Sequence, residues 1–427
     1  MNSYSTMNRS ELLGAEKALE EQYLTYKAQN LKLNMARGKP CTEQLKLSAG
    51  LLDCLKERDV LDNTGNDCRN YGGLEGIPEA RAMFADLLGI SPDNVLAGGN
   101  SSLNMMYDTL SRAMLFGMKH SVRPWAKEEK ITFLCPSPGY DRHFALAADL
   151  GFQLVAVPMT PEGPDMDAVE KLAGADPSVR GIWCVPLYSN PDGITYSEAT
   201  CRRLASMKTA APDFTIMWDN SYFVHHLHED RDHVPDIIGL CAEYGNPDRV
   251  YEFASTSKIT WAGAGIACMA SSLANIAFAK SHMTYQTIGP DKINQLRHVR
   301  FLKDTDGVID MMKKHEAILK PKFDAVLEIL KRELEPAGIA RWNVPRGGYF
   351  ISLFVAAGTA KEVVKLCKEC GVELTPAGAT YPYGIDPDDS NIRIAPSFPP
   401  VSELVAAIGV LCVSAKLAAV RRMLADA

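Results

Sequence analysis

The sequence predicts an α/β protein with a large domain, built on a mainly parallel sheet with helices on both faces, and a smaller α+β domain. From about residue 94, short apolar runs alternate with helix-patterned segments, and strands apolar on both faces are typical of covered parallel sheets. Polar, Gly and Pro residues cluster where these runs end, the edge at which open α/β sheets bind ligands. The chain of 427 residues is also too long to fold around one small core.

The strands of the large domain are expected where the apolar runs lie. Each run is short, rich in Val, Ile, Phe or Trp, and separated from the next by a helix-patterned segment. The runs cover residues 94–99, 131–140, 152–159, 181–191, 214–222, 249–258 and 264–272.

Beyond residue 305 the pattern changes to a long helix, in which apolar residues recur every three or four positions from Leu319 to Leu334. Pro321 lies inside it and is expected to kink it. Strands at 347–355, 372–378 and 391–396 and a C-terminal helix follow. The helical segment up to about residue 60 lacks a core of its own and is expected to pack on this unit. We therefore assign 65–305 to the large domain, and 1–64 with 306–427 to the small one.

Composition excludes several classes of protein. A net charge of -7 and a pI near 5.8 argue against a nucleic-acid surface, which shows clustered Lys and Arg. The N-terminus lacks a basic region followed by an apolar one, and we expect no membrane span, which needs about 18 consecutive apolar residues. A cytoplasmic protein is the expectation.

Two clusters of possible metal ligands favour ordinary structural roles. Cys367 and Cys370 form a C-x-x-C without a second pair, so we expect reduced core or surface thiols. His225, His226 and His228 follow an apolar strand without flanking carboxylates at ligand spacing, which favours a surface loop. No metal is expected.

A lysine and an aspartate at two strand ends indicate a catalytic site. Lys258 follows Ser255 and Ser257 at the end of an apolar run, and a partly desolvated lysine amine can act as a nucleophile beside hydroxyls that hold a phosphate. Asp219 ends the strand "FTIMWD". A carboxylate there is costly unless a cation satisfies it, and a protonated pyridine nitrogen is such a cation.

The order of these motifs resembles that of fold-type I, pyridoxal-phosphate-dependent aminotransferases of the class I/II superfamily. Within it, the chain is similar to the actinobacterial-type aspartate aminotransferase branch with a MocR-like aminotransferase domain. The match runs from about Arg37 to Arg393 and covers most of the chain. The matching motifs are "GGNSSLNMM", "PSPGYDRH", "NPDG", "DNSY", "STSK" and "NIRIAP".

The resemblance implies pyridoxal 5'-phosphate as cofactor and a role for each matched residue. Lys258, Asp219 and Tyr140 are the catalytic candidates: Lys258 bonds to the cofactor, Asp219 pairs with its ring nitrogen, and Tyr140 stacks on the ring. The other contacts are Ser101, Ser102, Ser255 and Ser257 at the phosphate, Asn190 and Tyr222 at the phenolic oxygen, and Arg393 at the substrate α-carboxylate, which Asn190 also adjoins. Taken singly, Asp219 could cap a turn and Arg393 could form a surface pair; the joint order favours the site.

Two further features follow from the same resemblance. Class I members carry an arginine shortly after the lysine that neutralises the phosphate, whereas this chain has Gly265-Ile266-Ala267 there. What replaces it is left open by the sequence. "NYGGLEGIPEAR" keeps the arrangement in which Tyr71 reaches the phosphate of a neighbouring subunit, which implies a homodimer with shared active sites.

The expected reaction is ping-pong transfer of an amino group from an L-amino acid, aspartate or glutamate first, to a 2-oxo acid such as 2-oxoglutarate. Arg37, next to Gly38, lies in the segment that closes over the substrate in this family and could bind a distal carboxylate. Arg142 and Arg346 compete for that assignment. Alternatives are an aminotransferase of alanine or aromatic specificity, a C–S lyase on the same fold, or a non-catalytic pyridoxal-phosphate-binding regulator, for which a DNA-binding segment would be expected upstream.

Overall fold

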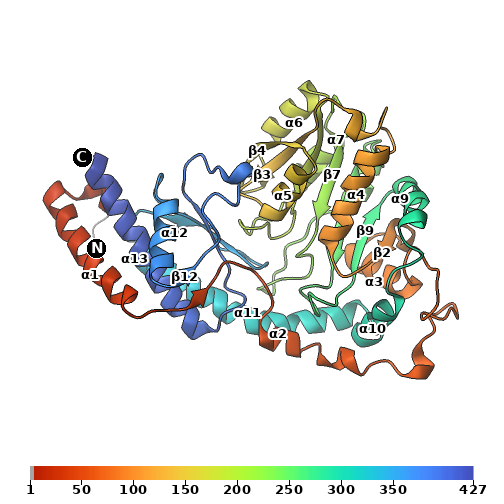
Figure 1. Ribbon diagram of the computed structural model, residues 1–427, viewed down its shortest axis with the longest axis horizontal. Helices are drawn as coiled ribbons and strands as arrows, with labels where there is room; N and C mark the ends of the chain where they lie inside the picture. The colour runs from red at the N-terminus through yellow and green to blue at the C-terminus, as the bar shows by residue number, and fades with distance from the viewer. Residues whose placement is uncertain (1–3, 427) are drawn as a thin grey trace.

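The computed structural model describes residues 4–426 and has its largest sheet in the middle of the chain (Figure 1). Within these residues the sheet has eight strands in the order β2-β9-β8-β7-β6-β3-β4-β5. The five central strands β8, β7, β6, β3 and β4 pair parallel with one another, while β2–β9, β9–β8 and β4–β5 pair antiparallel. The prediction of a mainly parallel sheet is confirmed. The strands are β2 (Val95–Ala97), β3 (Thr132–Ser137), β4 (Gln153–Thr160), β5 (Gly163–Pro164), β6 (Val179–Cys184), β7 (Thr215–Asp219), β8 (Val250–Ser255) and β9 (Ala267–Ser271).

Both faces of this sheet are covered by helices because its strands are apolar on both sides. In β7, Ile216 and Trp218 belong to one apolar cluster, and Met217 between them belongs to the opposite one, as the two-residue period of a strand requires. The apolar cluster that contains Met217 is covered by helices α4 (Ser102–Phe116), α5 (Asp141–Asp149) and α9 (Leu273–Gln286). The other is closed by α3 (Pro78–Leu88), α6 (Met166–Ala175), α7 (Glu198–Ser206), α8 (Ile237–Glu243) and α10 (Lys292–Leu302).

A smaller unit is built from the two ends of the chain, which lie near each other in Figure 1. Strand β1 pairs parallel with β12, and a second small sheet has the order β10-β11-β13. Within this unit, helices α1 and α13 pack side by side. Its elements are α1 (Arg9–Lys27), β1 (Leu33–Asn34), β10 (Arg341–Trp342), β11 (Ile351–Phe354), α12 (Ala360–Glu369), β12 (Val372–Glu373), β13 (Asn391–Ile394) and α13 (Val401–Asp426).

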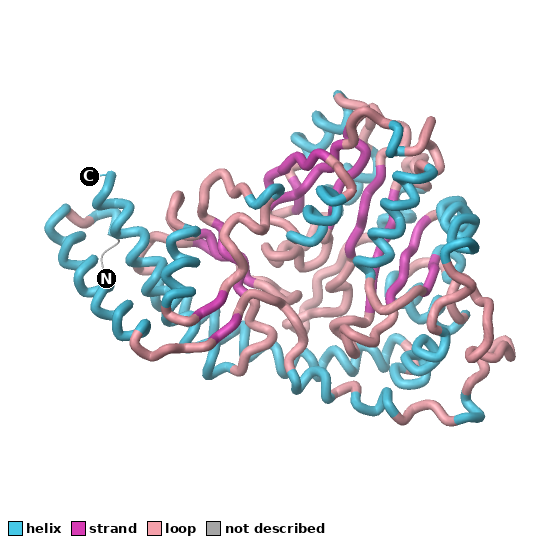
Figure 2. Tube along the Cα trace, in the orientation of Figure 1, coloured by secondary structure: helices cyan, strands magenta, loops and turns pink. Residues whose placement is uncertain are grey.

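The long helix α11 (Thr305–Leu334) runs between the two units along one side of the molecule, with the short helix α2 (Thr42–Lys46) beside it (Figures 1 and 2). Pro321 lies inside α11, and the helix continues through it for another 13 residues, to Leu334. Its buried residues include Leu319, Phe323 and Val326, as the predicted apolar stripe requires.

Helix α13 is long and apolar enough by composition to span a membrane, which the sequence prediction overlooked. Within the protein, however, 78% of its most apolar stretch is buried. Leu404, Ile408 and Leu411 are among its residues in the core of the small unit. We therefore interpret α13 as a core helix.

Candidate active site

The carboxyl ends of the parallel strands open into a cavity of about 800 Å³ between the large sheet and the small unit. It is the edge at which ligands of open α/β sheets bind. All candidate residues from the sequence except Tyr71 and Arg346 line this cavity: Arg37, Gly38, Ser101, Ser102, Tyr140, Arg142, Asn190, Asp219, Tyr222, Ser255, Ser257, Lys258 and Arg393. The structure thus brings together residues separated by more than 350 positions in the chain.

The Lys258 amine lies on the wall of this cavity. Its Nζ is 4.9 Å from the centre of the Tyr222 ring and 5.9 Å from that of Tyr349. Across the described chain, residues 4–426, the amine has no hydrogen-bond or ion-pair partner. Burial lowers its pKa below the usual 10.5, against the smaller opposing effect of the Asp219 charge. A neutral amine is what a nucleophile or a base at this position needs.

Asp219 at the end of β7 is held on both oxygens. Its Oδ2 lies 2.9 Å from His143 Nε2, and its Oδ1 accepts a hydrogen bond of 2.6 Å from the Ser221 hydroxyl. The His143 ring is itself fixed, since it stacks on Trp183 with a centroid distance of 4.3 Å. The carboxylate, 3% exposed, is therefore oriented before any ligand arrives.

His143 is a residue that the sequence interpretation missed. It lies on α5, three residues beyond Tyr140, and its ring meets the Tyr140 ring edge-on at 4.8 Å. The only signal in the sequence is this spacing, which puts His143 one helical turn from the predicted stacking residue.

Hydroxyl groups converge on one side of the cavity at the start of α4. Ser101 is the N-cap of α4, and its Oγ accepts a hydrogen bond from the Asn104 amide. Ser257 Oγ donates to the Asn100 carbonyl at 3.0 Å and lies 3.1 Å from Ser255 Oγ. Hydroxyls and free amides at a helix N-terminus form a binding site for an anion such as a phosphate.

Arg393 reaches the cavity from strand β13 of the small unit. Its Nη1 donates to Asp141 Oδ1 at 2.8 Å and to Asn190 Oδ1 at 3.4 Å, and its Nη2 donates to Thr375 Oγ1 at 3.3 Å. Its Nε is buried without a partner among residues 4–426. A buried guanidinium with an unsatisfied donor is suited to a carboxylate ligand.

The three arginines considered as ligands of a distal carboxylate differ in their positions relative to the cavity. Arg37 and Arg142 line the cavity, and both are exposed. Arg346 donates to Asp230 and Asp232 at 2.8 and 2.7 Å and lies outside the cavity. Arg346 is therefore engaged elsewhere and is not a candidate.

Gly38 lies where the N-terminal segment passes the small unit. A Cβ atom at this position would come within 2.5 Å of the Phe350 ring. The absence of a side chain thus lets residues 36–39 run close to Phe350 at the cavity wall. The guanidinium carbon of Arg393 lies over the same ring, 4.9 Å from the Phe350 ring centre.

Tyr71 lies outside the cavity, and 83% of it is exposed. Its backbone is nevertheless fixed, because Lys292 Nζ donates to the carbonyls of Tyr71 and Gly72 at 3.2 and 2.7 Å. An exposed aromatic side chain on a fixed loop is available to a partner molecule.

The histidine cluster is only partly the surface loop that we expected, because His228 is exposed, His226 is partly buried and His225 lies in the interior. His225 is buried, with its pKa held well below the ordinary value by burial first and by the Lys258 charge second. His226 Nδ1 lies 2.7 Å from the Tyr188 hydroxyl. The part of the chain that the structure describes contains no group of three metal-ligating side chains. The reason for the error is that the loop 220–234 is covered by α11 and by residues 345–349.

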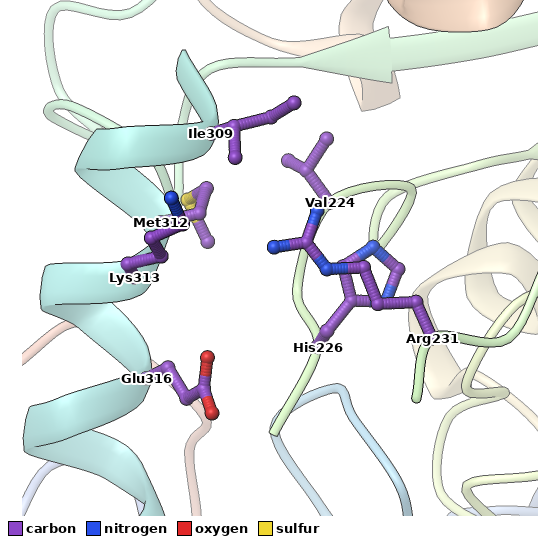
Figure 3. A pocket seen from close by; sticks show the side chains of 7 residues that line it. All are labelled: Val224, His226, Arg231, Ile309, Met312, Lys313 and Glu316. Atoms are coloured by element: carbon purple, nitrogen blue, oxygen red, sulfur yellow. The ribbon is translucent and has the colours of Figure 1, made fainter. Parts of the chain in front are cut away.

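A second pocket beside this loop is not a substrate site. Figure 3 shows His226 and Arg231 facing Lys313 and Glu316 of α11 across it. Its volume is about 20 Å³, which is room for about one water molecule.

A buried polar chain behind Lys258 was also missed. Gln44 Nε2 of α2 donates to the Tyr349 hydroxyl and lies against His315 Nδ1, both at 2.9 Å. His315 Nε2 in turn lies 2.9 Å from the carbonyl of Ile259, the residue after Lys258. These contacts tie the N-terminal segment and α11 to the turn that carries the lysine.

Comparison with known proteins agrees with this geometry. The family model described as aspartate amino-transferase matches residues 7–427. The chain is 48% identical over 401 residues to the aspartate aminotransferase of Corynebacterium glutamicum, covering 94% of this chain and 93% of that protein. It is also 48% identical over 426 residues to a putative aminotransferase of Mycolicibacterium smegmatis, covering 99% of this chain and all of that one. The crystal structure of an aspartate transaminase from C. glutamicum superposes with a TM-score of 0.97 at 46% identity, over 98% of this chain and 99% of that chain.

Proposed function

The chain belongs to the aspartate aminotransferase family and is an aminotransferase, and we propose that it transfers the amino group of aspartate or glutamate to a 2-oxo acid with pyridoxal 5'-phosphate as cofactor. The single observation that supports this most strongly is the pairing of a free Lys258 amine with a doubly held Asp219 carboxylate at one cavity. In a pyridoxal site the amine would bond to the aldehyde of the ring, and the carboxylate would pair with the ring nitrogen.

The residues present fit that cofactor. The hydroxyls of Ser101, Ser255 and Ser257 and the N-terminus of α4, at Ser102, would hold the phosphate. Tyr140, which burial gives a raised pKa of about 12, would lie against the ring. Tyr222 and Asn190 would reach the phenolic oxygen and Asp219 the ring nitrogen: these contacts remain proposals. When bound, the cofactor supplies an electron sink for the electrons released at the substrate α-carbon.

Lys258 supplies the proton transfer. Burial lowers the pKa of its amine, which favours the neutral form of Nζ that can accept the α-proton of the substrate. Asp219 would keep a proton on the ring nitrogen of the bound cofactor by charge-assisted hydrogen bonding. Water would supply the carbonyl oxygen of the oxo acid that leaves, the amino group would stay with the bound cofactor, and a second oxo acid would then take it up with release of that water.

Arg393 would bind the α-carboxylate of every substrate, since its buried Nε lacks a partner within the described residues and its fork can grip two oxygens. A distal carboxylate, which aspartate and glutamate carry, needs a second cation. Arg37 and Arg142 both qualify, because each has no ion-pair partner within residues 4–426 and each lines the cavity. Tyr71 would complete the site of a second subunit, so we propose a homodimer.

A half-reaction screen tests the proposal. The purified protein with pyridoxal 5'-phosphate is mixed with one amino acid at a time, and the change in cofactor absorbance is followed. We expect rapid change with aspartate and glutamate and slow change with alanine and phenylalanine. Arg37→Ala and Arg142→Ala are compared with Arg346→Ala as the matched control: the arginine that reads the distal carboxylate should lower kcat/KM for aspartate selectively. Equal rates with alanine and aspartate in the parent protein would contradict the proposed substrate class.

A further inference from the structure

The ion pair between Asp141 and Arg393 crosses the cavity from one unit to the other. Asp141 begins α5 on the large sheet, and Arg393 lies on β13 of the small unit. Asp141 Oδ1 accepts a 2.8 Å hydrogen bond from Arg393 Nη1. Both residues line the cavity in which the substrate would bind. The protein therefore already presents one carboxylate to the arginine that is expected to hold the carboxylate of the substrate.

The two members of the pair differ in how freely they can leave it. The Arg393 side chain is 6% exposed and is fixed by Thr375 Oγ1 and by the Phe350 ring. The Asp141 side chain is 32% exposed and lies at the first position of its helix. A hydrated aspartate loses less than a buried guanidinium when the pair separates, because water can replace its partner. Asp141 is therefore the member that can give way.

Within the described residues, Nη1 of Arg393 is not free to bind a ligand, because Asp141 and Asn190 already accept hydrogen bonds from it. The end-on fork of the guanidinium, formed by Nη1 and Nη2, is therefore engaged at both nitrogens, by Asp141 and Asn190 on Nη1 and by Thr375 on Nη2, while Nε is without a partner. A bidentate grip on an incoming carboxylate through Nη1 and Nη2 thus requires that Asp141 leave Nη1.

We propose that Asp141 is a specificity-determining residue that occupies the carboxylate position on Arg393 in the ligand-free protein, so that a substrate binds by exchanging its α-carboxylate for that of Asp141. This inference rests on the proposed role of Arg393. The exchange lowers the affinity of the site for carboxylates that offer nothing else. It also hastens release of the oxo acid product, since Asp141 returns to Arg393 as the product leaves.

A purely structural role makes a different prediction. An aspartate in the first turn stabilises a helix by its charge, with or without Arg393. Loss of that charge would lower thermal stability and leave carboxylate affinity unchanged. Loss of a scaffold that orients Arg393 would weaken carboxylate binding. Of these three roles, only the exchange predicts tighter binding, and measuring the affinity at high ionic strength screens out a simple long-range effect of the lost charge.

The test uses Asp141→Asn in the holoenzyme, with propionate as the probe because it has one carboxylate and no amine. Asp149→Asn is the matched control, since Asp149 ends the same helix, is exposed and lies outside the cavity. Isothermal titration calorimetry should give a dissociation constant about tenfold lower for Asp141→Asn than for the parent, and unchanged for Asp149→Asn. In steady state, KM for aspartate should fall with no gain in kcat, because product release slows. Asp141→Glu should restore the parental constant.

Arg393→Gln separates this inference from the proposed function. If propionate binds Arg393→Gln as tightly as it binds the parent, the assignment of Arg393 to the α-carboxylate fails. If Arg393→Gln loses propionate binding and Asp141→Asn binds it with the parental or a weaker affinity, the exchange is overturned while the proposed function stands.

Discussion

Replacement of Asp219 by Asn tests the catalytic assignment with little disturbance of packing. Asn has the shape of Asp, and residue 219 is 3% exposed, so volume and burial are conserved. The Ser221 hydroxyl, which donates to Oδ1 at 2.6 Å, can still donate to the amide oxygen. His143 at 2.9 Å can meet the amide group by changing its tautomer. The variant therefore removes a negative charge and little else.

The expected loss of kcat/KM follows from the surroundings of that charge. Taking away one partner of a buried, hydrogen-bonded charge pair costs about 3–5 kcal/mol, because the other charge remains desolvated. In the proposed site the other charge would be the protonated ring nitrogen of the bound cofactor, which is most needed when electrons flow into the ring. Since about 1.4 kcal/mol corresponds to a factor of ten, we expect kcat/KM for aspartate to fall by about 10²–10⁴.

The assay is the single-turnover half-reaction with aspartate, followed by stopped-flow absorbance. Asp248→Asn is the matched control, because Asp248 is also a paired and largely buried carboxylate but lies at the opposite edge of the sheet, next to the start of β8. The control should react at the parental rate. Turnover of aspartate by Asp219→Asn within about tenfold of the parent would show that Asp219 is a structural cap, and the assignment of this strand end to the cofactor would fail with it.

Three further predictions follow from the same structure. Lys258→Ala should abolish transamination and still retain cofactor, because the hydroxyls and Asp219 remain; full activity in a steady-state assay would remove the central assignment. Tyr71→Phe should weaken cofactor retention on dialysis, and mixing it with Lys258→Ala should restore one site per hybrid dimer, whereas no recovery on mixing would argue against shared sites. Burial raises the pKa of Glu252 to about 7, above its unfolded value, so the folded state binds the extra proton between about pH 4.5 and 7 and this group's stabilisation is lost as pH rises through 7. Glu252→Gln, which keeps an acceptor for Asn220 Nδ2 at that position, should therefore raise the free energy of unfolding by about 3 kcal/mol at pH 8 and have little effect near pH 4.5, as urea denaturation can measure.

The parts of the site that could be predicted are those in which a residue differs in polarity from the neighbours in its own segment of sequence. Lys258 and Asp219 are charged residues at the ends of strands that are otherwise apolar, and parallel strands end at one edge of a sheet. The pattern of each strand, considered alone, is therefore enough to single out Lys258 and Asp219. The serines near them were found for the same reason, because each follows a strand or begins a helix.

The parts that could not be predicted depend on pairs distant in sequence. Gln44 and Tyr349 are 305 residues apart, and nothing near either of them in the sequence indicates the other. Asp141 and Arg393 are 252 residues apart, and each also fits a surface role when considered alone. His225 was misjudged because residue type suggested exposure, whereas the packing of α11 over its loop decides its burial. Such contacts follow from the tertiary fold and leave no periodic signal.

The turn after Lys258 shows how the chain can manage without the arginine that the family resemblance led us to expect. Ile266 lies there, 1% exposed, with its amide donating to Thr256 Oγ1 at 2.9 Å, so this position is part of the core and cannot hold a cation. Within residues 4–426, no lysine or arginine side chain is hydrogen-bonded to Ser101, Ser255 or Ser257. The proposed phosphate site therefore relies on hydroxyls and on the N-terminus of α4, whose amides carry about half a positive charge. Because each neutral donor contributes little alone, the Tyr71 hydroxyl of a second subunit would be a substantial share of the whole, and cofactor retention and dimer formation would be linked.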